Sequence, residues 1–162
     1  MKKNNKTRGF LLFELLVAVG IMGLVFVTLF LLQTQFLKIK QDGIKKTKAV
    51  YYAEEAMEAV HHIRSVSGWA AIPTNGVTKF VTLQPAGFWT LDDSETPLAD
   101  AEFSRTVKFD SVNRETLPSG RISATGVDDP STRKITVSVS WESGAKKVEI
   151  ETYLTAWKDE LD

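Results

Sequence analysis

The sequence predicts an α+β fold: a long N-terminal helix, transmembrane in its first half, packed by its second half on an antiparallel β-sheet of about four strands. Three observations predict this layout. An apolar segment occupies residues 10–32, apolar positions at helical spacing continue through residues 33–66, and from residue 77 onward apolar residues recur at every second position. A chain of 162 residues is long enough for one modest domain in addition to such a segment.

The apolar segment at residues 10–32 contains 23 residues and a single ionisable side chain, Glu14. At about 1.5 Å of rise per residue it spans roughly 35 Å, enough to cross a hydrocarbon core of about 30 Å. A buried helix of a soluble protein is the alternative, but a domain of this size cannot surround so long an apolar rod. No small-x-small cleavage pattern follows before Lys38, so we expect the segment to be retained as one membrane-spanning helix.

Charge is distributed unevenly, although the whole chain is neutral with 20 basic and 20 acidic residues. The first nine residues contain no acid and four basic residues: Lys2, Lys3, Lys6 and Arg8. The remaining 16 basic and 20 acidic residues give residues 10–162 a net charge of −4. A lysine cluster at Lys38–Lys48 balances the N-terminal charges across the apolar segment, so the positive-inside rule alone does not fix the orientation. Without a global basic field, no nucleic-acid partner is identifiable.

Glu14 is the most informative residue of the apolar segment. A carboxylate at membrane depth costs on the order of 2.5–3.5 kcal/mol. Two explanations stay open on physical grounds: the side chain reaches the interface or is protonated, or it awaits a cationic partner that another chain supplies.

The residues around Glu14, from Lys6 to Val17, resemble the class III signal of type IV prepilins and type II secretion pseudopilins. The pattern is a basic leader that ends in glycine, then an aromatic residue, then glutamate four residues later inside an apolar helix. The resemblance implies that Gly9 is the last leader residue and that a prepilin peptidase exposes Phe10, which is then N-methylated. It also implies that Glu14 faces the N-terminal amine of a neighbouring subunit in a filament.

Two further stretches resemble one group of bacterial prepilins: Tyr51–Arg64 resembles the end of their long helix, and the C-terminal runs Thr136–Trp141 and Tyr153–Trp157 resemble their last strands. The sequence departs from many pilins in two ways. It has no proline near Leu31 in the apolar segment, and it has no C-terminal cysteine pair. These departures favour a minor pilin or a pseudopilin over a disulfide-looped major pilin.

The resemblance implies a domain layout and a function. Residues 1–9 are the cleaved leader, 10–32 the transmembrane and assembly helix, 33–66 its amphipathic continuation and 67–162 the sheet region. The chain would be a single-pass cell-membrane protein with an extracytoplasmic C-terminal domain, then a subunit of an extracellular or periplasmic filament. Its partners would be the membrane, other pilin or pseudopilin subunits, the prepilin peptidase and an inner-membrane assembly platform. The alternative is a single-pass, signal-anchored extracytoplasmic binding domain that forms no filament.

Beyond the membrane segment, apolar residues at helical spacing predict one continuous face: Phe36, Ile39, Val50, Ala53, Met57, Val60 and Ile63. Ser67-Gly68 and Pro73 end the helix near Val66. Alternating apolar residues then predict four strands: Val77–Leu83, Phe103–Phe109, Ile135–Trp141 and Val148–Leu154. Glu142–Ala145 predicts a hairpin turn, and Gln84–Asp100 and Pro118–Thr132 are expected to be loops.

No catalytic set is visible, so we expect neither an enzyme nor a cofactor. The chain has no cysteine, and its two histidines, His61 and His62, point about 100° apart on a helix and cannot chelate one metal ion. We expect one histidine at the surface and one at the helix–sheet contact. Asp92–Glu95 and Asp128-Asp129 lack an EF-hand pattern, which leaves a loop calcium site open. Three aromatic residues fall in predicted loops: Trp69, Phe88 and Trp89. If Phe88-Trp89 is exposed, it would be a candidate ligand or partner contact.

Mass spectrometry of the membrane-extracted chain tests the expected processing. We expect a chain that begins at N-methylated Phe10, because the leader resembles a prepilin peptidase substrate. An intact N-terminus at Met1 or Lys2 would instead support the simple anchored domain.

Overall fold

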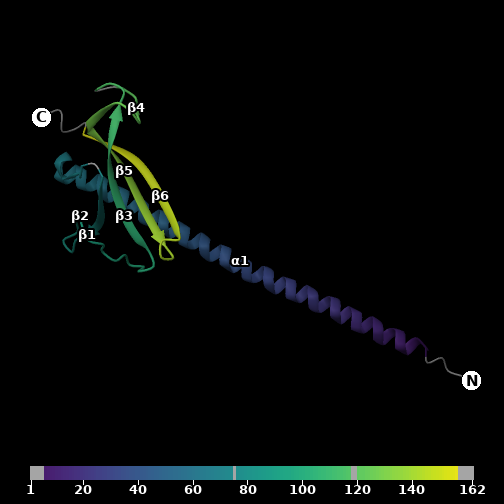
Figure 1. Cartoon of the computed structure of the whole chain (residues 1–162). Helices are drawn as coiled ribbons and strands as arrows, with labels where there is room; N and C mark the ends of the chain where they lie inside the picture. The colour runs from purple at the N-terminus through teal and green to yellow at the C-terminus, as the bar shows by residue number, and fades with distance from the viewer. Residues whose placement is uncertain (1–5, 75, 118–119, 157–162) are drawn as a thin grey trace, which may run out of the picture. The chain divides into compact units, whose positions relative to one another are not determined.

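The computed structural model describes residues 6–74, 76–117 and 120–156, with side chains from residue 11 onward. The chain divides into two compact units, Met1–Lys45 and Lys46–Asp162. Within these described residues the elements are, in order, one long α-helix, one short 3-10 helix and six strands (Figure 1). The predicted α+β class is confirmed.

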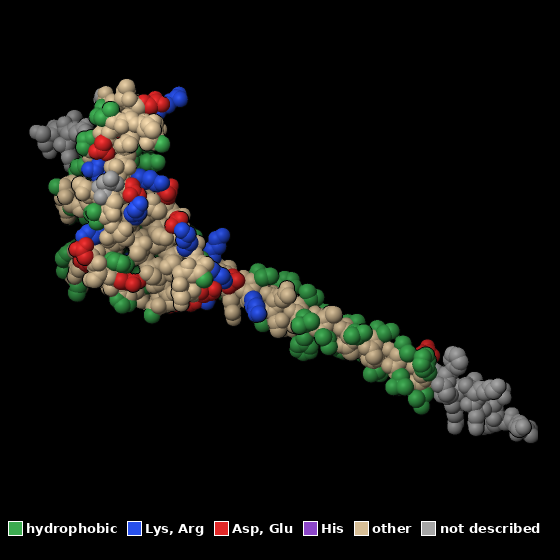
Figure 2. Space-filling view, viewed as in Figure 1, with side chains coloured by type: hydrophobic (Ala, Val, Ile, Leu, Met, Phe, Trp, Pro, Cys, Tyr) green, Lys and Arg blue, Asp and Glu red, His purple; other side chains and the backbone are tan. Residues whose placement is uncertain are grey.

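Helix α1 runs from Lys6 to Ser67, one residue beyond the predicted end. In the first unit its large apolar side chains are exposed, from 45% at Val17 to 70% at Leu24. Hydrophobic side chains cover the visible face of this segment (Figure 2). By length and composition, α1 is the one helix in the described part of the chain that could cross a membrane. Gly68 follows the last helical residue and has a φ of 76°. Glycine adopts this conformation without a steric penalty, which allows the chain to leave the helix here.

The second unit contains a fully antiparallel sheet in the order β2-β1-β3-β5-β6, with β4 paired to β3. The strands are β1 (Val77–Leu83), β2 (Trp89–Asp92), β3 (Ser104–Arg114), β4 (Ile122–Ser123), β5 (Val127–Trp141) and β6 (Lys146–Thr155). The predicted count of about four strands is therefore wrong. The two additional strands, β2 and β4, are four and two residues long and lie in the predicted loops, whose proline and glycine content favoured a loop over the short alternation of Trp89 and Leu91. Strand β5 also begins earlier than predicted, inside the second of these loops.

The core of the second unit lies between the last part of α1 and one face of the sheet (Figure 1). The helix contributes six buried residues: Ala49, Ala53, Ala56, Ala59, Val60 and Ile63. The sheet contributes larger side chains, among them Val107, Phe109, Ile135, Val137, Val139 and Trp141. Four alanines in this stripe leave room for the bulkier sheet residues, as interdigitated packing requires.

The predicted apolar face of the helix is correct only in part. Ala53, Val60 and Ile63 are buried, and Met57 packs against the core. Phe36 and Ile39, by contrast, lie in the first unit and are 70% and 67% exposed. Apolar periodicity alone could not separate a residue that packs on the sheet from one that stays exposed on the helix, because apolar residues occupy both kinds of position.

The predicted turn between the last two strands is confirmed. Trp141 pairs with Lys146, and the four residues between them form the loop. Glu142 and Ser143 have positive φ values of 53° and 56°, followed by Gly144 at 87°. Three consecutive left-handed residues reverse the chain, and the glycine takes its conformation without strain.

Replacement of Ala56 by leucine tests the alanine stripe. Ala56 is fully buried, so Ala56→Leu inserts three carbons into a packed contact and should lower the free energy of unfolding by about 1–3 kcal/mol. Glu58→Leu places the same side chain on the exposed side of the same helix and serves as the control. Thermal and urea unfolding of the full chain in detergent micelles measures both. Equal stability of the two variants would contradict close helix–sheet packing.

Candidate functional site

The residues of the predicted processing site lie at the start of α1. Gly9 and Phe10 are in its first two turns, and Glu14 follows Phe10 after one further turn. Of the predicted leader charges, Lys6 and Arg8 are in the first helical residues, while Lys2 and Lys3 lie outside the described residues. The helix thus places the backbone of the predicted new N-terminus one turn from the carboxylate.

Glu14 is exposed on the helix surface, in an apolar environment. It lines a shallow, open concavity together with Phe13, Val17, Ala18 and Ile21. No ion-pair partner of Glu14 is present among the side chains that the structure describes. A carboxylate surrounded by exposed apolar side chains can receive a cationic group, and the attraction strengthens if a partner excludes water there.

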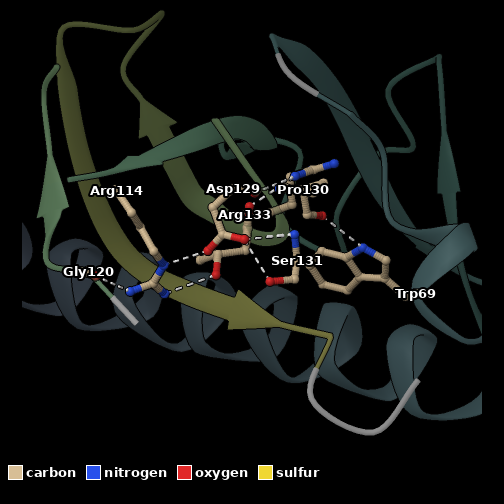
Figure 3. Close-up of polar contacts among 8 residues, drawn as sticks. Trp69, Arg114, Gly120, Asp129, Pro130, Ser131 and Arg133 are labelled. Atoms are coloured by element: carbon tan, nitrogen blue, oxygen red, sulfur yellow. Dashed lines mark hydrogen bonds and ion pairs between the residues drawn. The ribbon is translucent and has the colours of Figure 1, made fainter. Parts of the chain in front are cut away.

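A second polar site lies in the sheet unit, around Asp129 (Figure 3). Arg114 on β3 donates from Nε to Oδ2 of Asp129 at 2.6 Å and from Nη1 to the carbonyl of Gly120 at 2.9 Å. Arg114 Nη2 donates to Oγ1 of Thr132 at 3.2 Å. The other carboxylate oxygen, Oδ1, accepts from the backbone N–H of Ser131 at 3.0 Å and from its hydroxyl at 2.6 Å.

A β-bulge brings these groups together. Ser111 on β3 pairs with Arg133, but the next residue, Val112, pairs with Asp129, so three residues of β5 have no partner on β3. The proline among them, Pro130, is tolerated because a bulge removes the need for a ladder hydrogen bond. Its carbonyl accepts a hydrogen bond from Trp69 Nε1 at 3.2 Å.

The same bulge connects the sheet with the short helix η1 (Trp69–Ala71) that follows α1. The guanidinium of Arg133 lies over the Trp69 ring at 5.6 Å from its centroid, within cation–π range. In Figure 3, Trp69 lies on one side of the Asp129 cluster and Arg114 on the other. The cluster therefore fixes β3, β5 and η1 to one another.

The ionisation of Asp129 follows from these contacts. Its side chain is only 4% exposed, and burial by itself would raise its pKa. Hydrogen bonds from Arg114, Ser131 and Thr132 outweigh burial and hold the pKa of Asp129 well below its ordinary value. Its oxygens are already occupied by donors, which gives the cluster a structural role and leaves little room for a ligand.

Several sequence-based expectations are corrected here. Asp128-Asp129 lies in strand β5, not in a loop, and the first of the two is exposed. His61 and His62 are both exposed, so neither lies at the helix–sheet contact, which Val60 and Ile63 occupy. Asp93 in the other acidic run is paired with Lys79. Within the described residues, no group of three or more His, Cys, Asp or Glu side chains could hold a metal ion.

The three aromatic residues expected in loops have different environments. Trp69 is half-buried in η1, and Trp89 lies in β2 and packs against the core. Phe88, just before β2, is 50% exposed. Phe88 is therefore the one of the three that keeps a largely exposed ring.

Sequence reasoning missed an ion pair between the helix and the sheet, in which the arginine is buried and the glutamate is half-exposed. Arg105 on β3, 5% exposed, donates from Nη1 to Oε2 of Glu55 at 2.6 Å and to the carbonyl of Tyr52 at 3.1 Å. Its Nη2 donates to the carbonyl of Val81 at 3.2 Å. The signal was present: Arg105 occupies an inward position of the alternating run Phe103–Phe109, and a charge at a core position requires a partner.

Comparison of the chain with protein-family models, with curated proteins and with solved structures gives no match.

The pH dependence of stability tests the Asp129 cluster. Because the folded chain holds the pKa of Asp129 below its ordinary value of 3.8, the ion pair contributes stability that is present above that pH and lost as the pH falls below it. Asp129→Asn should cost about 3 kcal/mol at neutral pH, as in other broken buried pairs, and the difference from the natural chain should shrink in acid.

Unfolding of the full chain in detergent micelles, measured from neutral pH to below pH 3.8, checks this expectation. Asp128→Asn removes the same charge from the exposed neighbouring residue and is the matched control. Parallel stability curves for the natural chain and Asp129→Asn would show that the ion pair is not the source of the acid dependence.

Proposed function

We propose that this chain is a structural subunit, a minor pilin or a pseudopilin, of a type IV pilus or a type II secretion-like filament. It is processed after Gly9 and assembles through its N-terminal helix. One observation carries the proposal: within residues 10–32, the single ionisable side chain is Glu14, one helical turn after a Gly-Phe junction that resembles a prepilin cleavage site.

The exposed apolar surface of α1 supports a subunit that exchanges lipid for protein. Every large apolar side chain from Leu11 to Leu32 is at least 45% exposed, far more than a soluble domain leaves open to water. Lipid tails cover such a surface in a stored subunit, and the helices of neighbouring subunits cover it after assembly. Gly20 and Gly23 have open space where a side chain would begin, with no heavy atom within 4 Å, and allow close approach of another helix.

Cleavage after Gly9 changes the electrostatics of the helix end. It removes the four basic residues of the leader and leaves an amine on Phe10. An α-amino group has a pKa of about 7.7–8.0, so most of it is cationic at neutral pH, and N-methylation keeps a basic nitrogen. Processing thereby creates the kind of cation that Glu14 lacks within the described side chains.

Pairing of this amine with Glu14 of a neighbouring subunit favours one register between helices. At about 4 Å and an effective dielectric constant of about 20, two unit charges attract by roughly 4 kcal/mol. A slip by one helical turn, about 5.4 Å, moves the charges to roughly 7 Å apart and loses roughly 1.7 kcal/mol of this attraction. A carboxylate that is removed from water without a cationic partner is costly. Assembly therefore relieves a cost that the stored subunit carries.

The sheet unit supports an outward, water-exposed location for the rest of the chain. On the face of the sheet opposite the core, β3, β5 and β6 carry hydroxyl and charged side chains, such as Thr106, Ser138 and Glu149. No catalytic set accompanies this face in the sequence. A structural subunit needs no more than a stable, soluble outer domain, and the missing proline and cysteine pair favour a minor or pseudopilin role.

Replacement of Glu14 tests the assembly mechanism. Glu14→Gln and Glu14→Val should insert in the membrane and begin at Phe10 after processing, because neither change alters the Gly9-Phe10 junction. Each should enter filaments at least tenfold less than the natural chain, since a loss of about 1.4 kcal/mol already gives that factor. The measurement compares sheared filament and membrane fractions of the producing cells by immunoblot.

Thr28→Val is the matched control. Thr28 is a polar residue of the same helix, but its hydroxyl donates to the carbonyl of Val25 within its own chain. It should enter filaments as the natural chain does. Normal filament entry of Glu14→Gln would remove the role assigned to the carboxylate, and a chain found in no filament fraction would favour the anchored domain.

A further inference from the structure

Two charged regions bracket an uncharged part of α1. Between Glu14 and Lys38 the helix contains no ionisable side chain over residues 15–37. These 23 residues rise by roughly 35 Å, close to the hydrocarbon thickness of about 30 Å. If Glu14 lies near one interface of the membrane, Lys38 and Lys40 lie at the opposite one.

Both lysines are exposed and lie among exposed apolar side chains. Phe36, Leu37 and Ile39 are 70%, 55% and 67% exposed. The whole stretch is helical and belongs to the first unit of the chain. A helix with this alternation suits the boundary between acyl chains and headgroups: the apolar side chains enter the boundary, and each lysine extends its stem along them while its ammonium group stays at the polar level.

No acidic group in the described part of the chain forms an ion pair with Lys38 or Lys40. An anion that binds these lysines would therefore come from outside the described part of this chain. At the depth that the uncharged stretch sets, the phosphate groups of lipids are the most concentrated anions, and each lysine near an anionic surface contributes about 1 kcal/mol.

We propose that Lys38 and Lys40 bind the phosphate groups of anionic phospholipids at the membrane face opposite the N-terminus and so select an anionic lipid shell around α1. The inference rests on the membrane-spanning stretch and the two lysines that follow it, and not on filament assembly. It holds equally for a filament subunit and for a simple anchored domain, so its test is independent of the proposed function.

The chain has no cysteine, so a single label is straightforward to place. The full chain with Gln41→Cys carries a donor dye and is reconstituted in vesicles of equal parts phosphatidylcholine and phosphatidylglycerol. In separate samples, a trace acceptor dye is attached to the headgroup of one lipid or of the other. Energy transfer from the donor dye to the acceptor dye measures how close that lipid lies to the label. We expect the phosphatidylglycerol acceptor to be enriched near the label by roughly fivefold for each lysine, with the enrichment falling as salt is added.

Three variants identify the groups responsible. Lys38→Gln with Lys40→Gln should bring the two acceptors close to equal transfer, and Lys38→Arg with Lys40→Arg should keep the preference. Lys108→Gln with Lys147→Gln removes two exposed lysine charges from the sheet and should leave the preference unchanged. Circular dichroism checks that each variant keeps its helix.

Equal transfer to both acceptors in the natural chain would overturn the proposal. A loss as large in the Lys108 and Lys147 variant would also overturn it, because net charge and not this segment would then be responsible. If acidic protein surfaces meet the lysines instead, transfer between donor- and acceptor-labelled copies would rise without any lipid preference, and that result too would contradict lipid binding.

Discussion

The apolar side chains of α1 have two different environments, exposed in the first part of the helix and buried against the sheet in the last part. From Leu11 to Leu37 the large apolar side chains are exposed, whereas from Ala49 to Ile63 the buried stripe packs against the sheet. The hydrophobic effect acts on both parts, but through different partners. Large side chains suit a surface covered by lipid or by other helices, and alanines suit one that lies close to a sheet of bulky residues.

Two ion pairs, each with one buried member, fix what apolar contact alone leaves adjustable. Arg105 ties the helix to the sheet through Glu55, and Arg114 ties the bulge of β5 to β3 through Asp129. Apolar packing is non-directional, so it tolerates small shifts along the helix axis. A guanidinium with several defined acceptors does not tolerate them, because each shift would leave a buried charge without a partner.

The two proposals give different roles to the charges at the two ends of the uncharged stretch, one holding the subunit in the membrane and the other drawing it into a filament. Lys38 and Lys40 would favour the anionic surface of the membrane and hold the stored subunit there. Glu14 would favour a neighbouring amine and draw the subunit into a filament. In these proposals leader cleavage would decide between the two, since it would create that amine and leave the lysines unchanged. A subunit of this kind would remain stored until processing shifts the balance.

The sequence by itself determined the α+β class, the apolar helix, the four long strands and the turn at Glu142–Ala145, because each depends on local periodicity or local backbone preference. Its resemblance to a prepilin signal also indicated Gly9, Phe10 and Glu14 as a candidate site. Only the tertiary structure decided the short strands β2 and β4, the start of β5 and the exposure of both histidines. It also decided the ion pairs of Arg105 with Glu55 and of Arg114 with Asp129. The two ion pairs join residues of different elements, and a local pattern carries no information about such a partner.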